Sequence, residues 1–193
     1  MDERVTMKNS SQEQQYDITT AFIIDFVESA TASERHQLVS GWNHDAGYEV
    51  FNWISNDPKT DKATALMMYW RSGGFHNKMY VSKDDMLKVA SWDEERYDFI
   101  EQLEAKYLSG FYTKQKLAYD PTNDVLASGC SIGYNWTIEI SKGELKREIP
   151  MEMLSKLDGE HIEPEKEWAE GIPPYVDKMI KEAYKNARPK LPK

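Results

Sequence analysis

The chain has 193 residues, with 24 Lys or Arg against 33 Asp or Glu, and a formal net charge of −9 at pH 7. Apolar residues make up 40% of it, enough to bury a core, so a disordered chain is disfavoured. The acidic balance disfavours nucleic acid and membrane surfaces as partners and favours a basic protein. No apolar run reaches the ~20 residues of a membrane helix. Cys130, the single cysteine, excludes an intramolecular disulfide, and we expect a cytoplasmic protein.

Apolar periodicity divides the chain into three parts. Residues 1–16 lack it and are expected to form a mobile arm. Helical spacing then predicts a single mainly helical domain over residues 17–186, followed by a basic C-terminal tail over residues 187–193.

Helical signals dominate the first half of this domain. An apolar stripe predicts a helix from Ile18 to Ala30, and Thr31-Ala-Ser-Glu34 has the spacing of a capping box that opens the next helix. A short helix is expected over residues 50–54. Asp61 then stands at an N-cap position before a run that is apolar on most sides, which predicts a central helix over residues 63–70 ended by Gly73-Gly74.

The second half adds one β element to the prediction. Ser91-Trp-Asp-Glu94 resembles another capping box and precedes a helix with apolar residues spaced by threes and fours. Residues 134–140 alternate between apolar and polar, which predicts a strand, and we expect a small β-hairpin or strand pair near residues 134–149. Pro150 is expected to open a helix that continues through Leu157, and Pro173-Pro174 to open the last one.

Aromatic residues fall into two groups by position. Those on or beside apolar stripes are predicted to be core residues: Trp53, Trp70, Trp92 and Tyr107. Those near turns or strand edges are candidates for a binding surface, because amphipathic aromatics are enriched at protein interfaces: Trp42, Tyr48, Trp136 and Trp168.

Two motifs are compatible with an enzyme as an alternative function. Residues 129–133 match the G-x-S-x-G pattern around Ser131, but a strand rather than a helix is expected after the serine, which is the wrong context for a nucleophile elbow. A carboxylate–histidine cluster is the other candidate, with the alternative that its Asp residues cap helices; its members are His44, Asp45, Asp57 and Asp61. The pattern indicates no metal site and no cofactor.

The segments Trp42–Val50 and Asp61–Leu66, with Ile54 and Asn56-Asp57 between them, resemble the bacterial family known as domain of unknown function 4274. The resemblance covers roughly residues 34–117. Trp42 and Asn43 are transposed relative to the family pattern, and Thr60 stands where the family has Cys, so a cysteine nucleophile cannot apply here. The resemblance implies a mostly helical bacterial protein with no assigned activity, in the style of small acidic antitoxins or immunity proteins.

We therefore expect a non-enzymatic binding protein, an immunity protein that neutralises a cognate basic toxin or effector by occlusion, either as a monomer or as a weak homodimer. The expected contact residues are Trp42, His44, Asp45, Tyr48, Asp57 and Asp61. Two alternatives remain: a small hydrolase or metal-dependent enzyme that uses the histidine–carboxylate cluster or Ser131, and a helical scaffold or regulatory module.

Overall fold

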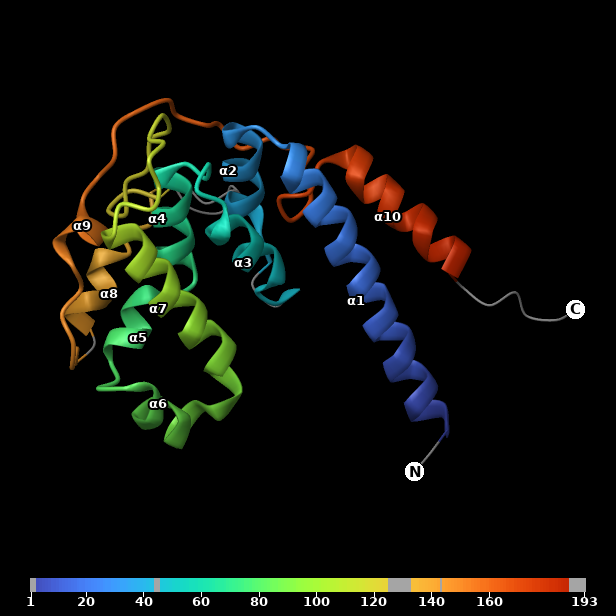
Figure 1. The fold of residues 1–193 in the computed structure, drawn as a ribbon, viewed down its shortest axis with the longest axis horizontal. Helices are drawn as coiled ribbons and strands as arrows, with labels where there is room; N and C mark the ends of the chain where they lie inside the picture. The colour runs from blue at the N-terminus through green and yellow to red at the C-terminus, as the bar shows by residue number, and fades with distance from the viewer. Residues whose placement is uncertain (1–2, 44–45, 125–132, 143, 188–193) are drawn as a thin grey trace, which may run out of the picture.

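A computed structural model shows that the chain is mainly helical, as the periodicity predicted (Figure 1). The structure describes residues 3–43, 46–124, 133–142 and 144–187. Its helices, in chain order, are α1 (Glu3–Ser29), α2 (Ala32–Gly41), α3 (Glu49–Asn56), α4 (Lys62–Arg71), α5 (Gly74–Lys78), α6 (Lys83–Ala90), the 3₁₀ turn η2 (Ser91–Asp93), α7 (Glu94–Leu108), α8 (Thr137–Lys142), α9 (Met151–Leu154) and α10 (Pro174–Ala187).

The core is built around α4. Every residue of α4 from Ala63 to Trp70 is buried, because α2 and α7 pack against this helix and the segment around α9 also contacts it. The Trp70 indole Nε1 donates to the Met153 carbonyl at 2.7 Å, which ties α4 to α9. The predicted central helix is therefore confirmed.

Helices α1 and α10 form a pair that projects from the body, with α10 running back along α1 (Figure 1). The Tyr184 hydroxyl donates to the Gln15 carbonyl at 3.0 Å, and Phe26 makes edge contacts with Trp168 and Tyr175. Because α1 begins at Glu3, most of the stretch expected to be a separate arm is part of this helix. Among the described residues, no helix combines the length and apolar character needed to cross a bilayer.

Several helix boundaries follow the predicted local signals. Thr31 and Glu34 form the capping box at the start of α2, and Asp61 caps α4 by accepting the Ala63 amide. Gly73 adopts the left-handed conformation, with φ +80°, between α4 and α5. Pro174 opens α10.

The predicted β-hairpin near residues 134–149 is wrong. Within the described residues this region holds no strand: Tyr134 makes one isolated antiparallel bridge to Asp124, and the chain then turns into α8. The Asn135 side chain accepts from the Thr137 amide at 2.9 Å and the Thr137 hydroxyl at 2.6 Å, so it starts a helix where the alternation predicted a strand.

Two predicted helix ends are also wrong. Ser91 does not cap α7, because it lies inside the turn η2 and an N-cap residue needs an extended backbone. The residue directly before α7 is Asp93, and its carboxylate pairs with Arg96 instead of capping the helix. The helix after Pro150 ends at Leu154 and does not reach Leu157, because Leu157 pairs with Tyr119 through two backbone hydrogen bonds of 2.9 and 3.0 Å.

Candidate functional site

Trp42 and Tyr48, two of the expected contact residues, belong to the core. They are 9% and 8% exposed. The Trp42 ring lies 5.6 Å from that of Phe51, and the Tyr48 ring lies 5.0 Å from that of Phe99. The expectation that they present a surface to a partner is therefore corrected: both rings fill space between α3 and its neighbours.

Asp61 has a structural role. It is 2% exposed, and its two carboxylate oxygens accept from the Ala63 amide at 2.9 Å and the Lys116 amide at 2.7 Å. One side chain thus caps α4 and fastens residues 114–116 to its start, a contact completed by the Lys62 amide and the Lys114 carbonyl at 2.7 Å. Its burial leaves almost no carboxylate surface for a partner.

Asp57 is half-buried and also committed to partners. It accepts from the Lys59 amide at 2.9 Å and from Nη1 of Arg35 at 2.6 Å. Burial raises the pKa of Asp57, but the Lys59 amide and the Arg35 guanidinium outweigh that effect and hold the pKa below its ordinary value. His44 and Asp45 lie outside the described residues, as do Cys130 and Ser131, so the predicted cluster is not brought together in the described part of the chain.

An exposed apolar corner lies instead at the junction of α6 and α7. Its residues are Val89 and Trp92, which are 70% and 83% exposed. The prediction that Trp92 is a core residue is wrong. The buried stripe of α7, extended back by four residues from Tyr97, reaches Asp93 and leaves Trp92 on the outside. This four-residue step from Tyr97 back to Asp93 is the signal in the sequence from which the exposure of Trp92 could have been predicted.

Acidic side chains without cationic partners lie near this corner. On one side of α7, Lys83 pairs with both Glu94 and Asp98, and Arg147 pairs with Glu101. In the described structure, no Lys or Arg pairs with the exposed Glu49 or Glu95.

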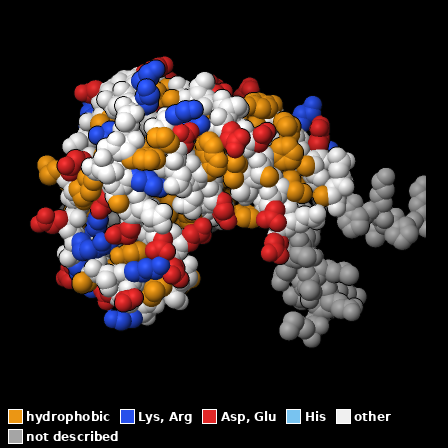
Figure 2. Space-filling model, viewed as in Figure 1, with side chains coloured by type: hydrophobic (Ala, Val, Ile, Leu, Met, Phe, Trp, Pro, Cys, Tyr) orange, Lys and Arg blue, Asp and Glu red, His pale blue; other side chains and the backbone are white. Residues whose placement is uncertain are grey.

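Glu49 and Glu95 are close enough to influence each other. Burial raises the pKa of Glu95, and the charge of Glu49 raises it further. The Tyr16 hydroxyl of α1 donates to Glu49, so the two carboxylates lie where α1, α3 and α7 approach one another. Figure 2 shows Asp and Glu side chains gathered along the hollow between the α6–α7 end of the body and α1.

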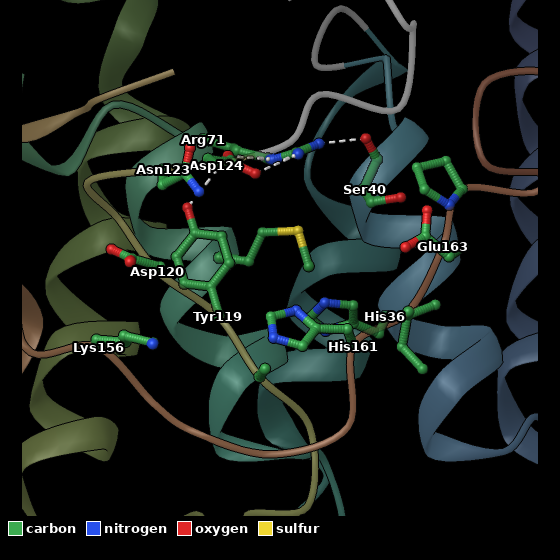
Figure 3. Close-up of a pocket in the computed structure, with 14 residues that line it drawn as sticks. His36, Ser40, Arg71, Tyr119, Asp120, Asn123, Asp124, Lys156, His161 and Glu163 are labelled. Atoms are coloured by element: carbon green, nitrogen blue, oxygen red, sulfur yellow. Dashed lines mark hydrogen bonds and ion pairs between the residues drawn. The ribbon is translucent and has the colours of Figure 1, made fainter. Parts of the chain in front are cut away.

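A cavity of about 190 Å³ lies on another side of the body, between α2, α4 and the segments 118–124 and 156–164 (Figure 3). Its upper wall is a buried polar network. Arg71 donates to both oxygens of Asp124, at 2.9 and 2.8 Å. Asp124 also accepts from the Tyr119 hydroxyl at 3.2 Å and from Nε1 of Trp136 at 2.8 Å. These four side chains join α4 to both ends of the segment 119–136.

His36 of α2 lines the same cavity. It is 7% exposed, and its Nδ1 lies 2.9 Å from the Thr64 hydroxyl. Burial and the nearby Arg71 guanidinium lower the pKa of His36 to about 3, against an opposing effect of Asp124. The imidazole is therefore neutral at physiological pH. Burial and the Asp124 charge raise the pKa of Tyr119 well above its ordinary value, so the phenol stays protonated.

This cavity could not be predicted from motifs or periodicity. Its residues come from four separate parts of the chain, and Arg71 and Asp124 are 53 positions apart. Among the described residues, no three His, Asp or Glu side chains are grouped so that they could hold a metal ion.

Comparison with known proteins adds one relationship. No curated protein and no solved structure matches this chain. Residues 30–108 match the model of the family described as "Domain of unknown function (DUF4274)", which confirms the resemblance predicted from the segments Trp42–Val50 and Asp61–Leu66.

Proposed function

We propose that this protein is a non-enzymatic binding protein that neutralises a basic partner protein by occlusion, as an immunity protein does. The observation that carries the proposal is Trp92, a large apolar side chain that is 83% exposed. Tryptophan is strongly enriched among the residues that dominate the affinity of protein interfaces. Val89, also largely exposed and three positions earlier in the chain, adds apolar area beside it.

Charge supports a basic partner. Glu49 and Glu95 are exposed carboxylates close enough for the charge of one to raise the pKa of the other, and the chain as a whole carries a charge of −9. Complementary charge accelerates association and disfavours wrong partners, while a buried aromatic anchor lowers the rate of dissociation. Trp92 would therefore supply affinity, and the carboxylates would supply orientation and speed.

Two carboxylates in the matched segment, those of Asp57 and Asp61, hold the fold together and are not free to contact a partner. Asp61 caps α4, and Asp57 holds Arg35, so both are already satisfied by protein groups. The part of the matched segment around Asp57 and Asp61 therefore shapes the body, and the proposed contact surface lies further along the same matched segment, around Trp92.

Co-expression with the toxic product of a gene encoded beside this one tests the proposal. Wild-type chain should restore growth, and the Trp92→Ala variant should fail to do so. Met151→Ala is the matched control, because Met151 is 74% exposed and lies in α9, away from the corner. Glu95→Lys should also weaken rescue, while Glu165→Lys, an equal charge change on another surface, should not. Rescue by Trp92→Ala equal to that of the wild type would contradict the proposed contact surface.

A further inference from the structure

A second cavity, of about 360 Å³, lies where the end of α4 and α5 meet the first turn of α7 and the residues just before α8. Its described lining residues include two arginines, Arg71 and Arg96, and no Asp or Glu. This contrasts with the whole chain, which has 33 acidic and 24 basic residues, and with the cavity beside His36, which three carboxylates line. The lining therefore offers donors to an anion without a competing carboxylate on the same wall.

Arg96 presents one end of its guanidinium to this cavity. Its Nε and Nη2 both donate to the Asp93 carboxylate, and Asp93 does not line the cavity. Within the described residues, no group accepts a hydrogen bond from the remaining nitrogen, Nη1. Nη1 therefore keeps N–H donors that a ligand can use.

Gly73 leaves Nη1 of Arg96 open to the cavity. A Cβ atom at this glycine would lie 2.8 Å from that nitrogen and 3.0 Å from Cδ2 of His76, and both distances are shorter than ordinary contacts. The backbone φ of +80° also favours glycine at this position. The missing side chain therefore keeps the space in front of the guanidinium clear.

The Tyr48 hydroxyl is a second donor. Its ring belongs to the core, but the side chain also lines this cavity. Burial raises the pKa of Tyr48 to about 12, and the Arg96 guanidinium and the Ser72 hydroxyl act in the opposite direction, so the phenol oxygen lies close to both. The Ser72 hydroxyl is buried and forms no hydrogen bond of ordinary length, so its proton is directed toward the phenol oxygen. The phenol proton of Tyr48 is then left for a ligand.

Aromatic rings complete the walls. Phe75 is largely buried, and Trp136 is held in place because its Nε1 donates to Asp124 at 2.8 Å. The Trp136 ring also makes an edge contact with Tyr134, with 4.6 Å between the ring centroids. Fixed rings favour another ring in edge or offset contact. The cavity thus combines two hydrogen-bond donors with aromatic walls.

We propose that this cavity binds a small aromatic carboxylate, whose two oxygens accept hydrogen bonds from Nη1 of Arg96 and from the Tyr48 hydroxyl while its ring contacts Phe75 and Trp136. The volume of about 360 Å³ admits a molecule of the size of benzoate or 3-phenylpropionate. A cation is disfavoured because no described lining residue carries a carboxylate. The inference does not depend on the proposed basic partner.

The backbone amide signals of Gly73 and Gly74 in NMR spectra of the full chain report on this cavity. We expect benzoate or 3-phenylpropionate to shift these signals in a saturable way. Benzyl alcohol and benzylammonium, which match benzoate in size, should leave the signals in place. Acetate has the carboxylate without the ring and should bind about tenfold more weakly or less, because the contact with the aromatic walls is lost. Saturable binding of benzylammonium, affinities for acetate equal to those for benzoate, or no saturable shift with either aromatic acid would each overturn the assignment.

Two tyrosine hydroxyls provide matched variants. Tyr48→Phe removes only the donor in the cavity and should weaken binding of the aromatic acid by about tenfold, because a hydrogen bond to a charged group is lost. Tyr107→Phe is the control, since the Tyr107 hydroxyl is also buried without a described partner but lies outside the lining. Arg96→Lys keeps a positive charge beside Asp93 but lacks Nη1, and it should also weaken binding. Equal affinities in wild type and Tyr48→Phe would contradict the proposed contacts.

Discussion

Arg71 and Asp124 form a two-point ion pair in the interior of the protein, with Nε to Oδ2 at 2.9 Å and Nη2 to Oδ1 at 2.8 Å. The two side chains are 7% and 3% exposed. Asp124 also receives hydrogen bonds from Tyr119 and Trp136. A single carboxylate therefore holds α4 and both ends of the segment 119–136 in place.

Loss of the Asp124 charge should be strongly destabilising. Asp124→Asn keeps the shape of the side chain but leaves Arg71 buried without its counter-charge, and removing one partner of a buried pair reduces the free energy of unfolding by about 3–5 kcal/mol. Urea denaturation measures this loss. Asp158→Asn, at a side chain that is 89% exposed, is the control and should leave the midpoint nearly unchanged. Equal midpoints for the two variants would contradict the structural role of Asp124.

Asp61 is predicted to act through its hydrogen bonds and not through exposed charge. Asp61→Ala removes the cap of α4 and the acceptor of the Lys116 amide, so we expect the free energy of unfolding to fall by about 2 kcal/mol. Asp61→Asn keeps one acceptor oxygen and should lose less. Thermal or urea unfolding of both variants tests this order, and an Asp61→Ala chain as stable as the wild type would exclude the capping role.

Local signals in the sequence were sufficient where short-range contacts decide the structure. Thr31 and Glu34 lie three positions apart and form the predicted capping box, and the apolar run before Trp70 forms the buried α4. The alternation around Tyr134 failed because Asn135 caps a helix there and Trp136 bonds to Asp124. The cavity could not be predicted, since it depends on contacts such as Arg71 to Asp124 across 53 positions.

The pH dependence of stability should contain a component from His36. The pKa of His36 is about 3 in the folded chain against 6.5 for an unperturbed group, so the unfolded chain binds more protons between these values. The free energy of unfolding therefore falls as the pH drops through this window, by up to about 1.4 kcal/mol per pH unit from this group.

His36→Gln removes that component. We expect its unfolding free energy to decrease less steeply between pH 6 and pH 4 than that of the wild type, whatever its absolute stability, because other titrating groups are common to both chains. Chemical denaturation at a series of pH values gives the two slopes. Parallel slopes would show that His36 is not held neutral by the fold.

The two tryptophans at opposite extremes of burial should behave differently. Trp92→Ala should change the free energy of unfolding by less than about 0.5 kcal/mol, because the side chain is largely exposed. Trp70→Phe leaves the Met153 carbonyl without its indole donor and opens space beside α4, so a loss of about 2 kcal/mol is expected. A large stability loss for Trp92→Ala would indicate a structural role and remove the case for a binding anchor.

The dissociation constant of the complex between this chain and its purified basic partner is the most direct test of the proposed function. Relative to the wild type, Trp92→Ala should weaken binding by about thirtyfold, as expected for an interface anchor worth 2 kcal/mol or more. Met151→Ala should bind like the wild type. An unchanged dissociation constant for Trp92→Ala, with the chain still folded, would contradict the account.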